Sequence, residues 1–566
     1  MSHFLSEFHN QLRSSIQNLA PLEQVLVLMA GVVVAIFLFS LLFTFSHTST
    51  NVWAQRGGKI TEGSVGTPRF IHPLYATTNS ERDLVKLIYS GLMRETEDGV
   101  FVPDLAESFT RSEDNKTYTF ILRDDAVFHD GHTVSADDIV FTYTQAQTLL
   151  EAPNLRAQWQ GVTVKKIDDR TVSVSLVESY ADFIDQTTLG IIPEHVWAEL
   201  EDEVVFSQFM IQPIGSGPFS VRSVVTNKEG LPKSFVLQRF SKFTLGAPYI
   251  RRIAYTIFEK SQDLYDAYQT RRVDNFVEDS ASAEDKKPNP SDTMQLNRLF
   301  GLFVSNKSTS PAKDPQTLAA LGYFIDKETL IAEALGGYAS AREGVLDISF
   351  AEDISASFDP AQGYELLAEE GWTYDEETAM ISSSSEDSSS QYFSFTLATS
   401  NAPHLIAVAE HLQETLATYG IEIVLDIYTS DALINEVIPE RSFDVLLFGM
   451  SIPNPASVSA FWHSSQQKDP GRNITQYINN ATDTLLEKAH VEHDSSVRES
   501  YYREFDALLA QDRPAIILYA PDLLYNTADR LQVALPQVID TPHERFNMVH
   551  QWFINEARVW SGFNQR

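Results

Sequence analysis

Cysteine is absent from this 566-residue sequence. Without a thiol the chain forms no disulfide, builds no thiolate zinc site and has no cysteine nucleophile. A lipid anchor attached through a cysteine is excluded for the same reason. Stability must come from noncovalent packing, and the composition, with 43% hydrophobic and 11% aromatic residues, is sufficient for packed globular lobes.

Positive charge is scarce. Lys and Arg number 42 against 77 Asp and Glu, which gives a formal net charge of −35. A surface this acidic repels phosphate backbones, so nucleic acid is not an expected partner. The charge also keeps a protein soluble, and residues 57–566 are expected to fold alone as a soluble monomer.

Several catalytic signatures are missing. The chain has no Gly-x-x-x-x-Gly-Lys-[Ser/Thr] loop, and in the stretch GSGP the residues Pro218 and Phe219 stand where no phosphate-binding lysine fits. Neither a Gly-x-Ser-x-Gly elbow nor a His-Glu-x-x-His pair occurs. The sequence therefore predicts no enzyme, no catalytic residue, no metal and no cofactor.

Long apolar runs are limited to one, VLVLMAGVVVAIFLFSLLFTF at residues 25–45, which has no charge. About 20 apolar residues span a bilayer as a helix, and a cleaved secretory signal has a shorter run. We expect an uncleaved anchor here, with residues 1–24 before it and a linker at 46–57 after it. The few basic residues do not decide its orientation. The large size of the C-terminal part favours a single-pass protein of the cell membrane with this domain outside the cytoplasm.

The length of the chain predicts two or three domains. Beyond residue 57, strand and helix patterns alternate: TYTFILR (117–123) and TVSVSLV (171–177) have the period of half-buried strands. The segment 359–371 predicts a helix, with Asp359 as N-cap. FDVLLFGM (443–450) is typical of a strand buried on both faces. This alternation indicates an α/β architecture.

The stretch VFHDGHTVSADDIVFTY holds His129, Asp130 and His132, which raises three interpretations: a metal site, an acid–base cluster or a turn. Asp130-Gly131 is a turn dipeptide, and Ser135 with Asp138 forms a capping box for a following helix. No third ligand is near in sequence, so we expect a turn. Another pair, His490 and His493, is expected on a solvated helix face.

The same region resembles a known family. Residues 87–143 are similar to the signature region of extracytoplasmic solute-binding proteins of family 5, the oligopeptide-, dipeptide- and nickel-binding proteins of ABC importers. The resemblance covers roughly residues 58–529. Further similar pieces occur in the family's order: PIGSGPFSV (213–221), LAALGYFIDKETLIAEALGGYA (318–339), FDPAQGYELLAEEGW (358–372), YGIEIVLDI (419–427), FDVLLFG (443–449) and RPAIILYAPDLLY (513–525).

The resemblance implies a type II periplasmic-binding-protein fold: two α/β lobes with a hinge and an inserted subdomain, here preceded by the predicted transmembrane helix. The hinge crossings are expected near residues 299–306 and 514–520. The implied boundaries are 58–75, 193–292 and 513–566 for lobe 1, 76–192 for the subdomain inserted in it, and 293–512 for lobe 2.

It also implies a function. A ligand between two lobes touches both only when they close, so it favours the closed form. The resemblance predicts a peptide or peptide-like solute as ligand, and ABC permease subunits as partners that receive it. An anchored sensor or interaction protein that uses the same clamp without transport is the alternative.

The resemblance also places the binding residues. Peptide-binding members carry an acidic residue at the position of Ser451, and Asn454-Pro455 stands where they have Asp-Pro. A serine cannot make a charge-assisted bond to an ammonium group. Gly449, Met450 and Ser451 are expected to offer backbone hydrogen bonds to an extended ligand. The expected pocket wall is Tyr75, Thr77, Phe461 and Trp462, each of which could also be ordinary packing.

Overall fold

The structure is a computed structural model. It describes residues 50–150, 152–200, 207–278, 292–346, 358–384 and 390–560, with scattered positions between 20 and 40. The span predicted to cross the membrane, residues 25–45, lies largely outside the described residues. Within the part of the chain that is described, no helix has both the length and the apolar composition to cross a membrane. The anchor therefore stays a prediction from the sequence.

The chain forms two compact units, one of residues 1–57 and 553–566 and the other of residues 58–552. In the smaller unit, β1 (Thr50–Gln55) pairs antiparallel with β24 (Asn555–Trp560). This pairing joins part of the predicted linker to the C-terminal segment.

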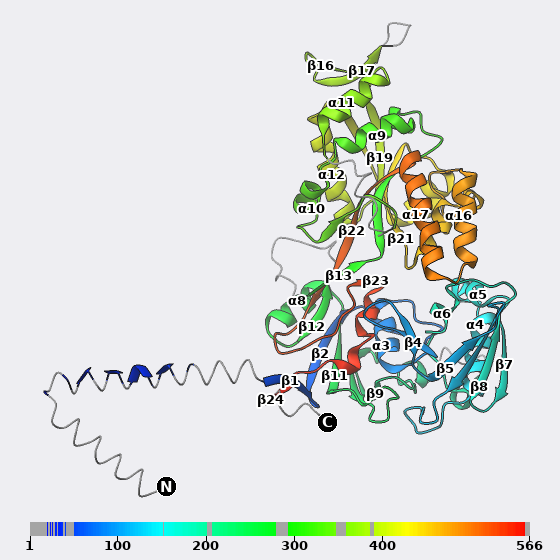
Figure 1. Ribbon diagram of the computed structural model, residues 1–566, viewed down its shortest axis with the longest axis vertical. Helices are drawn as coiled ribbons and strands as arrows, with labels where there is room; N and C mark the ends of the chain where they lie inside the picture. Colours follow the sequence, from blue (N-terminus) through cyan, green and yellow to red (C-terminus); the bar gives the residue numbers. More distant parts are fainter. Residues whose placement is uncertain are drawn as a thin grey trace, which may run out of the picture. The chain divides into compact units, whose positions relative to one another are not determined.

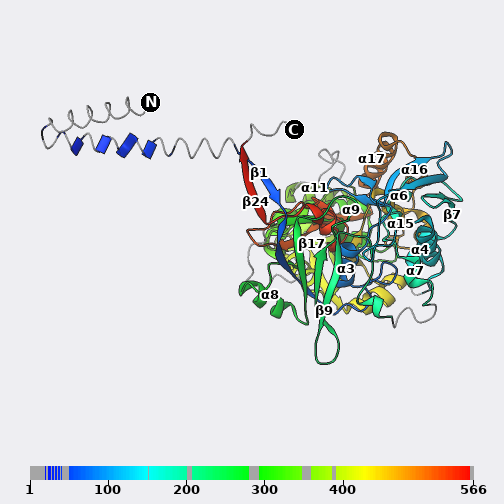
Figure 2. The ribbon, with the colours of Figure 1, turned by 90° about the horizontal axis from the view of Figure 1, so that it is seen from below.

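A 13-stranded sheet runs through the larger unit (Figure 1). Two of its members, β13 (Asp292–Leu296) and β15 (Ala339–Ala341), pair with β22, and β23 (Val538–Ile539) pairs with β13. The β9–β10 hairpin forms one edge, and its turn projects from the sheet (Figure 2). The main path, in order of pairing, is β20 (Glu422–Tyr428), β19 (Ser394–Ser400), β21 (Val445–Ser451), β14 (Arg298–Val304), β22 (Ala515–Asn526), β12 (Asn275–Glu278), β2 (Gly57–Val65), β11 (Ile250–Phe258), β10 (Pro232–Arg239) and β9 (Phe219–Thr226).

The chain crosses twice between the two parts of this sheet. We call the part with β14, β15 and β19–β21 lobe 2, and the part with β2, β9–β13 and β23 lobe 1. Strand β22 pairs with β14 through Ala515–Tyr519, and with β13 and β12 through Asp522–Asn526. The other crossing is β13 into β14, with Asn297 alone between them. The predicted crossings at 299–306 and 514–520 fall on β14 and β22.

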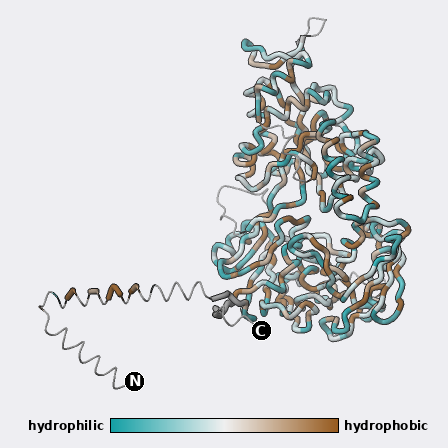
Figure 3. Tube along the Cα trace, in the orientation of Figure 1, coloured by the Kyte–Doolittle hydropathy of each residue, from teal (hydrophilic) through white to brown (hydrophobic). Residues whose placement is uncertain are grey.

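Lobe 2 has apolar side chains on both faces of its sheet. Phe300 and Leu302 of β14 belong to one core cluster, and Leu299 and Phe303 to the other. In Figure 3 hydrophobic stretches lie in the interior strands. The first cluster packs against α9 (Pro315–Tyr323), α10 (Lys327–Ala334), α11 (Pro360–Glu369) and α12 (Pro403–Ala417), and the second against η7 (Pro455–Val458), α15 (Ser459–Trp462), α16 (Asn480–Val491) and α17 (Ser495–Asp512).

Smaller elements complete lobe 2. A three-stranded sheet consists of β16 (Thr373–Asp375), β17 (Met380–Ser384) and β18 (Ser390–Tyr392). The predicted N-cap of α11 is confirmed, because the Asp359 side chain accepts a hydrogen bond from the Gln362 backbone. The short helices are η4 (Pro311–Lys313), α13 (Ser430–Ala432), the π-helix η6 (Leu433–Val437), α14 (Ile438–Glu440) and η8 (Ser464–Gln466).

A separate subdomain is built on a four-stranded sheet. The two strands predicted from alternation are confirmed, and Tyr118, Phe120 and Leu122 are buried on one face. The sheet order is β5 (Ala106–Arg111), β6 (Thr117–Leu122), β8 (Thr171–Ser175) and β7 (Thr163–Asp168). With it lie β3 (Met93–Glu95), β4 (Phe101–Pro103), α4 (Ala136–Thr148), α5 (Pro153–Trp159) and α6 (Phe183–Gln186).

The predicted turn at residues 127–133 is present. Val127 and Thr133 form an antiparallel bridge, and Gly131 has a φ of +98°, which favours glycine. Both ring nitrogens of His129 bond to backbone groups: Nδ1 accepts from Gly215 N at 3.3 Å, and Nε2 donates to Gly217 O at 3.0 Å. His129 is therefore a packing residue between the turn and the GSGP stretch.

The interior of lobe 1 holds a buried ion network. The helices of lobe 1 are α3 (Asn79–Ile88), α7 (Glu194–Trp197), α8 (Ser261–Gln269), η2 (Gln208–Met210), η9 (Pro542–Phe546) and η10 (Val549–Gln551). The predicted boundary at residue 76 places α3 in the inserted subdomain, but we assign it to lobe 1 because Asp83 on α3 is bonded to Arg545 on η9. Arg545 of η9 donates two hydrogen bonds to Asp83 of α3, at 2.8 and 2.6 Å, and two to Glu62 of β2, at 2.9 and 3.3 Å. Tyr525 and Tyr255 donate to the same two carboxylates. The network fixes η9 and α3 against the sheet.

Candidate functional site

A cavity of about 1420 Å³ opens among the described residues. It lies between the inserted subdomain, the loop after β21 and the C-terminal segment of lobe 1. Ligand pockets commonly measure about 300–1,000 Å³, so this one is large enough for a short peptide. Its lining comes from segments 95–101, 155–159, 180–189, 453–459 and 535–544, with Lys86, Asn297, His490 and Arg498.

The lining is rich in carboxylates. Seven acidic side chains face the cavity against one lysine and one arginine. They come from the inserted subdomain and from lobe 1, so two walls of the cavity carry negative charge. Such a cavity attracts cationic groups and disfavours a ligand whose net charge is negative. The seven, which we call together the acidic wall, are Glu95, Glu97, Asp98, Asp182, Asp185, Asp540 and Glu544.

Three of these carboxyls hold protons more tightly than usual. Burial, with the nearby Glu544 carboxylate, raises the pKa of Glu95 to about 7 and that of Asp540 to about 7. Burial, with the nearby Asp182, raises the pKa of Asp185 to about 6. A cation bound among them would favour their charged forms. Perturbed acids in a cleft are typical of functional sites.

Lys86 supplies the positive charge on the lobe 1 wall. It lies on α3, three residues from Asp83, so the buried Arg545 network holds the helix that carries it. Burial lowers the pKa of Lys86, and the carboxylates of Glu544, Asp104 and Glu95 act in the opposite direction. Glu544, one residue before Arg545, is positioned by the same network.

Several contacts join the inserted subdomain to lobe 2 beside the cavity. Asn454 donates from Nδ2 to Asp185 Oδ2 at 3.2 Å, and Arg498 lies 3.6 Å from Asp182. Asn454 occupies the position where the resemblance places the family's aspartate. The loop after β21 therefore reaches the acidic wall through an amide side chain.

His490 is exposed on α16, as expected, while His493 lies beyond the end of that helix, and both residues also belong to these contacts. The His490 ring stacks on Tyr180 with centroids 5.6 Å apart, and its carbonyl accepts from Ala181 N at 3.1 Å. His493 lies 2.7 Å from Arg111 Nη1. Burial and the neighbouring Arg111 lower the pKa of His493.

The seven residues expected from the resemblance lie outside this cavity's lining. Met450, Phe461 and Trp462 are buried in the lobe 2 core. Gly449 pairs with Phe300 across β14, and an added Cβ would lie 2.7 Å from the Phe300 ring. Ser451 is exposed at the end of β21.

The other two expected residues lie at the start of α3. Tyr75 packs its ring against His72 at 5.2 Å. Thr77 is exposed, and its backbone N donates to Glu81 at 2.9 Å. Sequence position did not reveal the acidic wall, because its members Glu95, Asp185 and Asp540 are spread over more than 400 residues.

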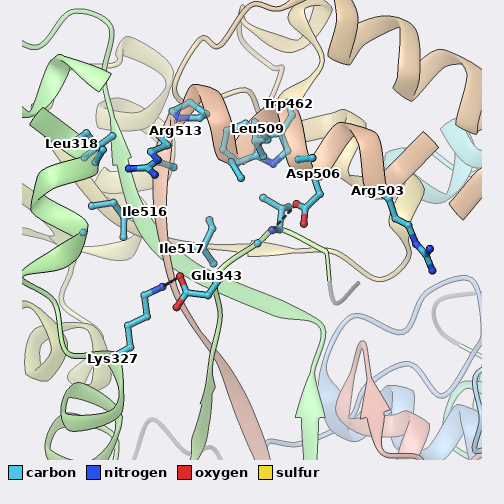
Figure 4. Close-up of a pocket in the computed structure, with 18 residues that line it drawn as sticks. Leu318, Lys327, Glu343, Trp462, Arg503, Asp506, Leu509, Arg513, Ile516 and Ile517 are labelled. Carbon is cyan, nitrogen blue, oxygen red and sulfur yellow. Dashed lines mark hydrogen bonds and ion pairs between the residues drawn. The ribbon is translucent and has the colours of Figure 1, made fainter. Parts of the chain in front are cut away.

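A second cavity, of about 120 Å³, lies inside lobe 2 between α9, α17 and β22 (Figure 4). Lys327 pairs there with Glu343 at 2.7 Å, and Asp506 accepts from Val345 N at 3.1 Å. Burial raises the pKa of Asp506 to about 6. Its volume is far below that of a peptide site.

Metal-ligating atoms gather at one place among the described residues, on Asp130, His132 and His195. None of the three lines the large cavity. No third metal ligand lies near His129 and His132 in the sequence. In the structure, His195, from a distant segment, lies beside Asp130 and His132.

Comparison with known proteins defines the family. The model of bacterial extracellular solute-binding proteins, family 5 Middle, matches residues 100–471. The chain belongs to this family, whose members are solute-binding proteins rather than enzymes. The chain is similar to the oligopeptide-binding protein AppA of Bacillus subtilis (strain 168), with 26% identity over 490 residues that cover 83% of this chain and 87% of AppA.

Solved structures share the fold. The ABC transporter substrate-binding protein CtaP from Listeria monocytogenes has a TM-score of 0.71 and 23% identity, covering 88% of this chain and all of that one. AppA from Bacillus subtilis in complex with a nonapeptide has a TM-score of 0.62 and 23% identity, covering 89% of this chain and all of that one. The predicted α/β periplasmic-binding-protein fold is thereby confirmed.

Proposed function

We propose that the protein is a membrane-anchored extracytoplasmic receptor that binds a peptide or peptide-like solute between its lobes and delivers it to an ABC importer. The observation that carries the proposal is the acidic cavity of about 1420 Å³ in a chain of family 5. The likeness to an oligopeptide-binding protein supports a peptide as ligand. The chain is a receptor rather than an enzyme, and the comparisons do not favour the sensor alternative.

The negative charge of the cavity limits which chemical groups the ligand can place there. A free amino terminus or a basic side chain fits among Glu95, Asp185 and Asp540, where each charge-assisted hydrogen bond contributes about 1.5–3 kcal/mol. Lys86, which has the opposite charge, is suited to a carboxylate of the same ligand. An acid at position 451 is therefore not required to hold an ammonium group.

The edge of β21 is the proposed contact for the ligand backbone. Strand β19 pairs with β21 at Leu397–Val445 and Ala398–Leu446. Beyond Leu446, no described strand pairs with that edge of β21, although Thr399 Oγ1 of β19 donates to Leu447 O at 3.1 Å. The stretch beyond Leu447 includes Gly449, Met450 and Ser451. An extended peptide can add there as a strand. Tyr75, Thr77, Phe461 and Trp462 stay proposals for the wall of a more closed form.

Closure is the proposed signal to the transporter. The two crossings, β13–β14 and β22, are the parts of the large unit that can bend between the lobes. A ligand that touches both the acidic wall and β21 completes contacts in the closed form alone, so it shifts the population toward that form. The permease would then recognise the closed receptor, while residues 25–45 keep it at the membrane surface.

Calorimetry with matched peptides tests the proposal. We expect a peptide with two lysines to bind at least tenfold more tightly than its twin with two glutamates, a difference of about 1.4 kcal/mol. If the free amino terminus of the lysine peptide lies among the acidic side chains, the N-acetylated lysine peptide should bind more weakly than the unmodified one. If no peptide binds while a sugar or a metal chelate does, the peptide proposal is wrong.

A further inference from the structure

Three side chains from separate parts of the inserted subdomain and lobe 1 meet on the surface. His195 Nε2 lies 2.7 Å from Asp130 Oδ2, and His132 Nδ1 lies 3.1 Å from the same oxygen. The two imidazole rings have centroids 3.9 Å apart and an interplanar angle of 31°. All three ligand atoms lie within 4.8 Å of one another.

The turn holds Asp130 in place before any ligand arrives. Its Oδ1 accepts a hydrogen bond from the His132 backbone N at 3.1 Å, so Oδ2 is the oxygen that faces both imidazoles. Phe128 N donates to His132 O at 2.7 Å and Gly131 N to Phe128 O at 2.9 Å. Backbone hydrogen bonds within residues 128–132 thus fix the turn that carries two of the three ligands.

The third ligand is positioned by a different contact. His195 is the second residue of α7, and the preceding Glu194 N donates to Asp138 Oδ1 at 2.8 Å. Asp138 also caps α4, which directly follows the turn. The same carboxylate therefore ties the segment that carries His195 to the element that carries Asp130 and His132.

These distances suit a small transition-metal ion. Zn²⁺ binds histidine nitrogen at about 2.0–2.1 Å and carboxylate oxygen at about 2.0–2.2 Å in tetrahedral geometry, which places ligand atoms about 3.3 Å apart. The two nitrogen–oxygen separations of 2.7 and 3.1 Å require shifts of about 0.6 and 0.2 Å to reach this geometry, and all three ligand atoms lie within 4.8 Å of one another. Imidazole with carboxylate favours zinc, nickel or copper over calcium or magnesium.

We propose that Asp130, His132 and His195 bind one divalent transition-metal ion, with water in the remaining coordination position. The ion would cross-link the turn to α7. His132 and His195 have side chains 63% and 33% exposed, so an ion can enter from solvent. The site is separate from the acidic cavity, whose lining includes none of the three residues.

Zinc titration of the full-length protein tests the proposal. The protein is purified in detergent without a histidine tag, stripped with EDTA and titrated with ZnCl₂ by calorimetry and native mass spectrometry. We expect one Zn²⁺ per chain and a rise in the melting temperature. His132→Ala, His195→Ala and Asp130→Asn should each weaken binding at least tenfold and remove that rise.

His129→Ala is the matched control, because it removes an imidazole from the same turn whose nitrogens already face Gly215 and Gly217. His411→Ala, in lobe 2, replaces it if the first control melts early by circular dichroism. The proposal is overturned if the wild type binds no zinc, or if His132→Ala and the control bind zinc equally well. Either result means that the cluster makes hydrogen bonds only.

Discussion

Asp138 and Glu194 are joined across 56 residues by one hydrogen bond. Glu194 N donates to Asp138 Oδ1 at 2.8 Å, while Ser135 N donates to Asp138 Oδ2, also at 2.8 Å. A helix-capping residue expected to act locally therefore also fixes the start of a second helix. Both oxygens of one buried carboxylate satisfy N–H groups that would otherwise lack partners.

Replacing this carboxylate should cost measurable stability. We expect Asp138→Ala to lower the free energy of unfolding by about 1–3 kcal/mol, because two N–H groups lose their acceptor. Urea denaturation followed by circular dichroism measures it. Asp137→Ala is the control, since Asp137 is half exposed and pairs with Lys166 at the surface, which contributes about 0–1 kcal/mol. Equal losses in both variants would contradict the double role.

Replacing the buried Arg545 of lobe 1 should lower the free energy of unfolding by more than replacing Asp138. Arg545→Met leaves Glu62 and Asp83 as buried charges without their cation, and we expect a loss of about 3–5 kcal/mol. Arg530→Met is the control, because Arg530 has a side chain 56% exposed and pairs with Asp274 alone at 2.7 Å. Its loss should stay below about 1 kcal/mol. A small effect of Arg545→Met would show that the network is not needed to hold η9.

The acidic wall predicts a pH dependence of stability. Glu95 and Asp540 each have a pKa of about 7 in the folded protein, above their ordinary values near 4. The folded state thus binds their protons more tightly than the unfolded chain. Their contribution is most favourable below about pH 4 and is lost as the pH rises toward 7.

Replacing Glu95 and Asp540 by neutral residues should remove the stability that the protein loses as the pH rises. We expect the double variant Glu95→Gln, Asp540→Asn to exceed the wild type in stability by about 1 kcal/mol or more at pH 8, with little difference at pH 4. The same variant should bind the lysine peptide more weakly. Glu97→Gln, an exposed acid of the same cavity, is the control for the stability measurement. A pH-independent difference would mean that these carboxyls titrate normally.

The part of the chain after the predicted anchor should fold without that anchor. We expect residues 57–566 to be a folded monomer by circular dichroism and size-exclusion chromatography without detergent. Residues 50–566 keep β1, which pairs with β24, and should show slower hydrogen exchange in β24. If residues 57–566 were unfolded, the division into anchor and independent domain would be wrong.

Local features of this fold were readable from the sequence, and long-range ones were not. The N-cap at Asp359 and the strand at 117–122 depend on neighbours within a few residues, so propensity and period predict them. The alternation of strand and helix patterns predicted the α/β architecture, and the resemblance to the family predicted its two-lobed form. The acidic wall and the partnership of His195 with Asp130 depend on how distant segments meet, and no spacing rule contains that information.

Asn297 stands where β13 becomes β14, and it contacts both lobes. Its backbone N donates to Ile539 O at 2.8 Å, its carbonyl accepts from Ile452 N at 2.9 Å, and its side chain donates to Asp540 Oδ1 at 2.6 Å. Asn297, at one of the two crossings between the lobes, thus hydrogen-bonds a carboxyl whose pKa is about 7. Under the proposed closure, proton binding at Asp540 and the lobe angle become reciprocal variables: a ligand that closes the receptor would change its proton uptake, and pH would change its tendency to close.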